Sequence, residues 1–465
     1  MDDATTWARE EFGRARFGDC RLTKRLIRVA EEAARRPAGQ ITQVFSTART
    51  REGAFRLVEN DAVTVHELVQ ASSRKCAERS AGNDFVFVPV DGSSLNLTDD
   101  KRSKGTGVVG SRRVGARGFQ VMTALAITPD GTPTGLCGQT WWARTAAVAK
   151  KKTGGMDKRP VEQKETRHWL EVMRQVRETF SSESDPRPWF QLDRGGDAWP
   201  VILDGLDPEH LFTVRATYDR RLQVQGRDDQ RIYLRPTLEA RPVLATYELE
   251  VPQSGKRKAR RAQIEIRTSQ VTLDLHVTPK RTTGATLWAV LAREAPATVP
   301  AGEKPIEWLL LTTHAAQTEE EARLVLFGYS QRWRIEEFHR LWKTGACNVE
   351  DNQLRDADHV FRWATILAAV ALRLLRLTYL ARTAPDAPAT VELSAAEIKA
   401  IVVARAPTSL PRSISIAHAV RWLADLGGYT GYRSSGPPGA LTIARGLQRI
   451  EILASVLSRR DRDQW

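Results

Sequence analysis

The chain has 465 residues, which is too long for one hydrophobic core and predicts two to four domains. Hydrophobic residues make up 41% of it, including 13 Trp and 13 Phe, which excludes a disordered chain. It carries 70 Lys and Arg against 56 Asp and Glu, a net charge of +14 that favours a polyanionic partner, most often nucleic acid.

Several other classes of protein are also disfavoured by the sequence. The four cysteines form no CxxC pair, and the eight histidines show no HExxH spacing, so neither a zinc site nor a disulfide framework is indicated. The N-terminus is acidic and lacks the apolar segment of a signal peptide. The most apolar stretch, 366–372, is too short to span a bilayer. We therefore expect a soluble protein of a reducing compartment, with no membrane partner.

Residues 1–70 have the pattern of a small helical domain. Asp19 can cap a helix that ends at 37–39, and a second helix is expected over 47–58. The first helix carries apolar residues on one face and cations on the other: Leu22, Leu26, Val29 and Ala33 against Arg21, Lys24, Arg25 and Arg28. We interpret this region as a DNA-binding helical module, although the pattern alone fits a small solvated bundle about equally well.

Two short apolar strands each end at an aspartate. Phe85–Val90 is followed by Asp91, which we expect in a Gly-Ser-Ser turn, and 189–192 is followed by Asp193 in the sequence DRGGD. Asp197 lies four residues further on and can cap the next helix. An acid after a strand is often only a turn residue, so these aspartates alone carry little weight.

The segments around these strands are basic or rich in strand signals. Residues 101–118 predict a cationic loop beside Asp91, and 118–127 with 134–142 predict a β-hairpin. A basic linker is expected at 150–158, followed by a helix over 161–180. From about 218 to 295 the alternating pattern predicts an all-β insertion with a DNA-facing basic turn at 256–261, and 306–312 predicts one further strand.

The stretch 329–343 predicts a helix with one charged and one apolar face. At 3.6 residues per turn, Tyr329, Arg332, Glu336 and Lys343 fall within about 40° of one line. The opposite face carries Phe327, Ile335, Phe338, Leu341 and Trp342, which we expect to face a core. Such a charged face can lie beside a phosphodiester, but it also fits an ordinary solvated Arg–Glu pair.

The C-terminal part is predicted to be helical throughout. A long apolar helix is expected over 359–380, and a Pro/Ala-rich linker at 383–390 marks a domain boundary. Two helices should follow, at 414–426 and 441–457, and each carries an apolar stripe. A stripe of this kind usually packs within its own domain. The stripe residues are Ile416, Val420 and Leu423 in the first helix, and Ile443, Leu447, Ile450 and Leu457 in the second.

The spacing Y-x2-R-x3-E-x6-K at Tyr329, Arg332, Glu336 and Lys343 resembles the YREK motif of the IS-four family of DDE transposases. The stretch RWRIEEFHRLWKTGA is similar almost residue for residue to the Tn-five-type (IS-fifty-like) transposases, which perform cut-and-paste transposition. The segments WAREEFG, FGDCRLTKRL, REGAFRLVEN, QTWWAR, DRGGD and IEWLLLT extend the resemblance over most of the chain, and it thins out after about residue 385.

The resemblance implies an α/β fold with an RNase H-like catalytic core at 71–383 that contains the all-β insertion. A helical N-terminal domain at 1–70 would bind DNA ends, and a helical C-terminal domain at 384–465 would dimerise. Two Mg²⁺ or Mn²⁺ ions per active site would be held by Asp91, Asp193 and Glu336.

The resemblance also implies the order of steps and the partners. Water nicks one strand, the new 3′-hydroxyl attacks the opposite strand to form a hairpin, and the reopened end joins target DNA. The partners would be the transposon ends, target DNA and a second copy of the chain, in the cytoplasm and nucleoid of a bacterium. Residues implied to contact DNA are Tyr329, Arg332, Lys343, Arg340, Arg215, Trp308 and Trp333, and the basic helix adds Arg25 and Arg28.

One residue departs from the family pattern. Arg340 stands where the family has lysine, so the positive charge is kept but the phosphate geometry differs. Two other functions remain open: a two-metal DNA endonuclease without strand transfer, and a non-cleaving inhibitor that binds transposon ends. The complete set of three acids and the complete N-terminal region argue against the inhibitor.

Overall fold

The computed structural model describes residues 7–99, 104–110, 115–144, 160–182, 185–223, 231–255, 257–278, 281–406, 409, 411–432 and 436–463. The predicted basic linker at 150–158 lies outside these residues, as do two parts of the predicted cationic loop, 101–103 and 111–114. The side chain of Leu457 is also outside the described part.

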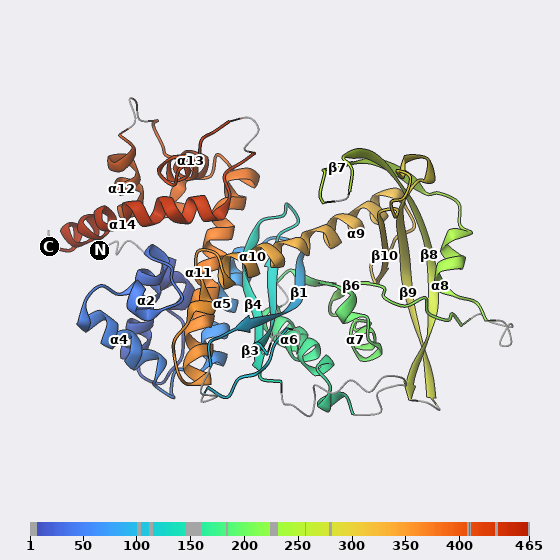
Figure 1. Cartoon of the computed structure of the whole chain (residues 1–465), viewed down its shortest axis with the longest axis horizontal. Coiled ribbons are helices and arrows are strands. Elements are labelled where there is room, and N and C mark those ends of the chain that lie inside the picture. The colour runs from blue at the N-terminus through green and yellow to red at the C-terminus, as the bar shows by residue number, and fades with distance from the viewer. Residues whose placement is uncertain are drawn as a thin grey trace.

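The described strands form one mixed sheet that runs from the middle of the molecule to the end opposite the N-terminal helices (Figure 1). Their order is β2-β3-β1-β5-β6-β10-β9-β8-β7, with β4 paired to β3. β1, β5 and β6 run parallel, and the pairings of β1 with β3 and of β6 with β10 are antiparallel. The bounds are β1 Phe85–Asn96, β2 Gly107–Val108, β3 Arg117–Ile127, β4 Pro133–Trp142, β5 Arg187–Leu192, β6 Leu211–Arg215, β7 Ala245–Val251, β8 Arg260–Thr278, β9 Arg281–Glu294 and β10 Glu307–Thr312.

The central strands are apolar on both faces because helices cover both sides of the sheet. Val86, Val88 and Val90 of β1 pack in a cluster with α6 (Thr166–Thr179), α7 (Trp199–Asp204) and α8 (Leu234–Glu239). Phe87 points the other way and packs with α9 (Glu319–Gln331). This alternation follows from the two-residue period of a strand. The mixed α/β class expected from the sequence is therefore confirmed.

β1 is longer than predicted. Asp91 lies inside the strand, opposite Thr123 of β3, and the expected turn after Val90 is wrong. The sequence GSS suggested a turn, but the antiparallel pairing with β3 keeps the backbone extended as far as Asn96. The parallel pairing with β5 does end at Val90, opposite Leu192, so Asp91 and Asp193 emerge at the same edge of that pair.

The N-terminal helices match the prediction closely. Asp19 caps α2 by accepting a hydrogen bond from the Arg21 backbone N–H, and Thr47 caps α4. The expected boundary at residue 70 falls inside α5. The helices of this region are α1 Trp7–Phe12, α2 Cys20–Arg35, α3 Ile41–Val44, α4 Ala48–Val58 and α5 Val65–Ser80.

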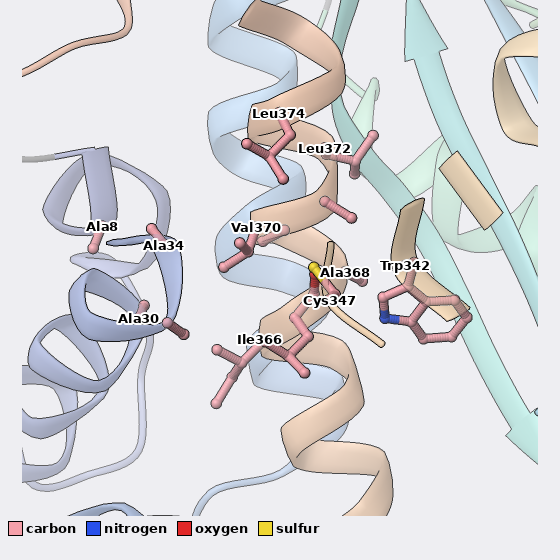
Figure 2. Packing of buried hydrophobic residues seen from close by; sticks show 14 of the residues in the cluster. Ala8, Ala30, Ala34, Trp342, Cys347, Ile366, Ala368, Val370, Leu372 and Leu374 are labelled. Atoms are coloured by element: carbon pink, nitrogen blue, oxygen red, sulfur yellow. The ribbon is translucent and has the colours of Figure 1, made fainter. Parts of the chain in front are cut away.

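α11 (Ala357–Thr383) is the central helix of the largest core (Figure 2). Ala30 and Ala34 of α2 lie on one side of it, and Trp342 lies on the other. α11 is longer than the apolar stretch seen in the sequence, and its length and mean hydropathy of 1.6 would allow it to cross a bilayer. However, 89% of the most apolar 18-residue stretch of α11 is buried inside the protein, as is typical of a core helix.

The predicted helix over 329–343 is the second half of a longer, nearly continuous helical segment, α9 and α10 (Trp333–Lys343), which meet at Arg332 (Figure 1). Thr318 begins α9 with a capping box to Glu321. Gly328 lets α9 approach β1 closely, because a Cβ there would lie 2.5 Å from the Phe87 ring. Phe327 was expected in the core but is 43% exposed, and the other four apolar residues are buried as expected.

The predicted all-β insertion is corrected in two respects. It contains the helix α8, and its strands β7, β8 and β9 continue the central sheet through β10 instead of forming a separate one. α8 was missed because residues 232–234, which lead into it, are apolar and resemble a strand, and a six-residue helix has almost no periodic signal. In the predicted basic turn, the Arg260 side chain is 8% exposed and forms ion pairs with Glu294 and Glu303, whereas the Arg261 side chain is 74% exposed.

The C-terminal region contains α12 (Ala395–Arg405), α13 (Ile416–Leu426) and α14 (Ala440–Asp463), of which α12 was not predicted. The stripe residues described in α13 and α14 are buried in the same core as α11. The stripes therefore pack within the chain, as the simpler interpretation held. The short 3-10 turns are η2 Val161–Gln163, η3 Arg194–Gly196, η4 Pro296–Thr298, η5 Val349–Asp351 and η6 Ala389–Val391.

Candidate active site

Two of the three predicted acids are neighbours at one edge of the β1–β5 pair. Asp91 is held within β1, where its Oδ1 accepts a hydrogen bond from the Gly92 backbone N–H at 2.9 Å. Asp193 follows β5 and caps the η3 turn by accepting from the Gly195 N–H at 2.7 Å. Both carboxylates thus have one oxygen fixed by backbone, which limits how far each can rotate.

The third acid reaches the same place from a helix. Glu336 lies in the first turn of α10, and Arg332 Nη2 is 2.6 Å from its Oε1. Nη1 of the same guanidinium is 3.4 Å from Asp91 Oδ2. One arginine at the α9–α10 junction therefore contacts two of the three predicted acids at once.

The charge at this cluster is not fully balanced. The pKa of Asp91 is raised to about 7, first because the carboxyl is removed from solvent and then because Asp193 and, less strongly, Glu336 carry like charge. Arg332 acts in the opposite direction but does not cancel these effects. The side chain of Asp91 is 18% exposed, so a solvent path to it remains.

An aromatic and cationic wall stands beside the acids. Tyr329 is 4% exposed, and burial raises the pKa of its hydroxyl, while the nearby Arg332 and Arg215 act to lower it. Trp308 of β10 packs edge-on against Tyr329, with 5.1 Å between ring centres. Arg215, at the end of β6, donates to the Glu307 carbonyl oxygen at 3.0 Å, which fixes its side chain on this wall.

The remaining residues of the predicted motif lie along α10. Trp333 is 57% exposed and Arg340 is also exposed. Lys343 Nζ is 3.6 Å from Glu350 Oε1, and that same oxygen accepts from the Asn96 backbone N–H at 2.9 Å. Glu350 therefore ties Lys343 to the end of β1. Sequence reasoning missed Glu350, since nothing in its local pattern distinguishes it from other exposed acids.

Arg25 and Arg28 are not part of this cluster. They lie on α2, and α11 lies between α2 and α10 (Figures 1 and 2). Asp197 also differs from the prediction: α7 has no side-chain cap, and Asp197 instead accepts from the Thr217 backbone N–H at 2.6 Å and pairs with Arg220. The sequence could not reveal this bond because its partners are about twenty residues away.

The donor atoms at the cluster are carboxylate oxygens, which hard divalent cations such as Mg²⁺ prefer. Across the described ranges, however, no three His, Cys, Asp or Glu side chains are gathered closely enough to form a ready-made metal site. Arg332 occupies the position between Asp91 and Glu336. A divalent cation would supply the positive charge that the three acids still lack.

Comparison with known families gives a match at the N-terminus. Residues 4–63 match the family model described as Transposase DNA-binding. The match covers α1 to α4, which include the cationic face of α2. The N-terminal region is thus a transposase DNA-binding domain, and DNA is a partner of the protein.

Proposed function

We propose that this protein is a DDE transposase of the IS-four family, of the Tn-five type, that cuts its element out of DNA and inserts it elsewhere. The observation that carries the proposal is the contact of Arg332 with both Asp91 and Glu336, beside Asp193. An ordinary Arg–Glu pair on a solvated helix needs only Arg332 and Glu336. Here Asp91 from β1 and Asp193 from the end of the neighbouring strand β5 lie at the same place. Parallel β1 and β5 with antiparallel β3 are also compatible with an RNase H-like core.

In the proposed site Asp91, Asp193 and Glu336 hold two Mg²⁺ or Mn²⁺ ions. Bound there, the ions would activate the attacking water or 3′-hydroxyl and stabilise the leaving oxygen. Arg332 fixes the directions of the Asp91 and Glu336 carboxylates. Lys343 and Arg340 supply positive charge for phosphates along α10, which suits a DNA backbone that crosses the acids.

The aromatic residues fit a role in hairpin formation. A hairpin requires a base to leave the stack, which costs a few kcal/mol that an aromatic contact offsets. Trp333 is exposed enough to accept such a base, while Trp308, Tyr329 and Arg215 form the fixed wall next to it. We place hairpin formation and opening at this wall.

The active species in this proposal is a homodimer that bridges two transposon ends. Cutting both ends needs two active sites, and each chain would supply one set of acids. The apolar stripes of α13 and α14 are buried within the chain and are not available for the contact. Ile452 and Val456 of α14 are 76% and 53% exposed and are better candidates for it. Such a transposase would work at the nucleoid of a bacterial cell.

The test uses the short inverted repeats that would flank the gene. The full-length protein is incubated with DNA that ends in these repeats and with Mg²⁺, and a denaturing gel resolves nicks, hairpins and joined products. Nicks, hairpins and joined products together support the proposal. Nicks without joined products would indicate an endonuclease, and binding without nicks would indicate an end-binding inhibitor.

A further inference from the structure

A basic and aromatic cavity of about 630 Å³ lies beside the turn that carries Asp193. It is formed by the segment after β6, the start of α7 and the far end of the β8–β9 hairpin. Its lining contains four Lys or Arg side chains and two Asp side chains. This excess of positive charge is suited to a phosphate-bearing ligand.

Three aromatic side chains, Trp199, Tyr218 and Tyr233, line the same cavity. Tyr218 is 61% exposed and Tyr233 is 38% exposed. Large aromatic side chains normally bury most of their surface, so two exposed rings facing one cavity are unusual and mark a surface for stacking.

The cavity wall is rigid and is attached to the Asp193 turn. The Asp197 carboxylate is fully buried and accepts from Arg220, and the Arg220 guanidinium carbon lies 5.4 Å from the centre of the Tyr218 ring. Thr217 donates its hydroxyl to the Arg194 carbonyl oxygen at 3.0 Å. These bonds fix the backbone that presents Tyr218 and join it to the residue directly after Asp193.

We propose that this cavity binds one unpaired nucleotide of a DNA strand that passes the Asp193 end of the sheet. The base would stack on Tyr218, and the adjoining phosphate would lie near Arg231, because the charge of Arg220 is compensated by Asp197. A base offers its face to a protein side chain only when it is unstacked from its neighbours, which favours a single strand over a duplex. The inference rests on the proposed function, because it assumes that DNA reaches the acidic cluster.

The test is photocrosslinking of the full-length protein in metal-free buffer, so that no cleavage occurs. The probe is single-stranded DNA of about six nucleotides with one 5-iododeoxyuridine, a length within the range of known single-strand sites. Mass spectrometry of peptides locates the crosslink. We expect it at Tyr218 or in the segment containing Tyr233, and we expect thymidine monophosphate to compete poorly, since it lacks the neighbouring phosphates.

Variants of Tyr218 test whether a base stacks on its ring. Tyr218→Ala should weaken crosslinking and affinity at this site by roughly five- to a hundredfold, the range for loss of one base–aromatic stack. Tyr218→Phe should retain both crosslinking and affinity. A probe with an abasic position should bind the wild-type protein as weakly as the intact probe binds Tyr218→Ala. Tyr432→Ala is the matched control, since Tyr432 is 71% exposed in the C-terminal region.

The inference is overturned if all crosslinks map elsewhere, if Tyr218→Ala matches wild type, or if the monophosphate competes as well as the strand. Its failure is distinguishable from failure of the proposed function. Active cleavage with no crosslink at the cavity removes only this inference. A crosslink at the cavity in a protein that cleaves no DNA removes only the proposed reaction.

Discussion

Arg332 Nη1 lies 3.4 Å from Asp91 Oδ2, although the two residues are 241 positions apart in the chain. The same guanidinium contacts Glu336 one helical turn away. A fork of this kind is specific to arginine, because lysine presents a single point charge. The contact therefore sets the relative position of a strand acid and a helix acid, and it motivates the first two predictions.

Arg332→Lys should reduce cleavage by about a hundredfold, the cost of misplacing a reacting group by about an ångström. The substitution keeps the charge but cannot direct both carboxylates. The measurement is the initial nicking rate at saturating Mg²⁺. Arg323→Lys on α9 is the matched control, because the Arg323 guanidinium pairs with Glu319 and donates to the Thr246 carbonyl oxygen rather than to the three acids. Wild-type nicking by Arg332→Lys would show that the fork has no positioning role.

Asp91→Asn, Asp193→Asn and Glu336→Gln should each lower metal-dependent cleavage by about two orders of magnitude or more, because each removes a carboxylate that would hold the divalent ions, and so removes the charge stabilisation that the ions supply. Binding to transposon ends should survive, since it rests on the N-terminal domain. Gel shift and cleavage assays on the same preparations measure the two effects. Glu337→Gln is the control, because Glu337 accepts from the Tyr379 hydroxyl and not from Arg332. Any one acid whose loss leaves nicking unchanged is not part of the site.

Trp333→Ala should slow hairpin formation or opening more than it slows the first nick, with little change in Tm, because Trp333 is 57% exposed. Trp342→Ala on the same helix should instead destabilise the fold by about 3–5 kcal/mol, since Trp342 is fully buried and donates to the Ala364 carbonyl oxygen. A time course of nicks and hairpins, together with thermal unfolding, separates the two residues. Equal loss at every step for Trp333→Ala would indicate a structural role only.

Stability should fall with acidification because of His339. Burial, with smaller effects from Lys343 and Arg332, lowers the pKa of His339 to about 3, whereas an unfolded histidine titrates near about 6.5. The folded protein therefore favours neutral His339. The contribution of this residue to the free energy of unfolding is complete above about pH 6.5, and it is lost as the pH falls toward about 3. Between about pH 7 and about pH 5 the loss from this residue should be about 2 kcal/mol.

The measurement is the free energy of unfolding in urea at the two pH values. His339→Leu should remove about that much of the pH dependence, and His66→Leu should leave it unchanged, because His66 is exposed. If His339→Leu shows the wild-type pH dependence, the acid sensitivity arises elsewhere, for example at His168 or His210, whose pKa values burial also lowers to about 4.

A mixture of two inactive variants should recover cleavage if the protein acts as a DNA-bridged dimer. One partner carries Asp91→Asn, and the other carries Arg25→Ala with Arg28→Ala on α2. In trans cleavage, the protomer that binds one end cuts the other end, so a mixed dimer holds one working site. Gel assays of the mixture and of each variant alone provide the measurement. No recovery, with both proteins folded and able to associate, would contradict trans action.

The sequence predicted those helix caps, helix faces and hairpins that depend on residues close to one another in the chain. The Asp19 cap, the apolar period of α2, the helix at 47–58 and the 118–142 hairpin depend on residues that are close in sequence, and each occurs as expected. The same holds for the apolar face of α10, whereas Phe327 of α9, which was expected on the same face, is 43% exposed. The N-terminal prediction also extended to function, since the DNA-binding match covers the helices that carry the cationic face.

Tertiary structure decided everything that depends on which segments meet. The sequence placed Asp91 in a turn, and only pairing with β3 keeps it in a strand. The apolar stripes of α13 and α14 suited either an interface or a core, and their packing against α11 made them core. Asp197, Glu350 and Arg260 find their partners across many residues, so no local pattern revealed their roles. The physical reason is that helix periods and caps act over one or two turns of chain, whereas ion pairs and sheet registers join residues that only the folded chain brings together.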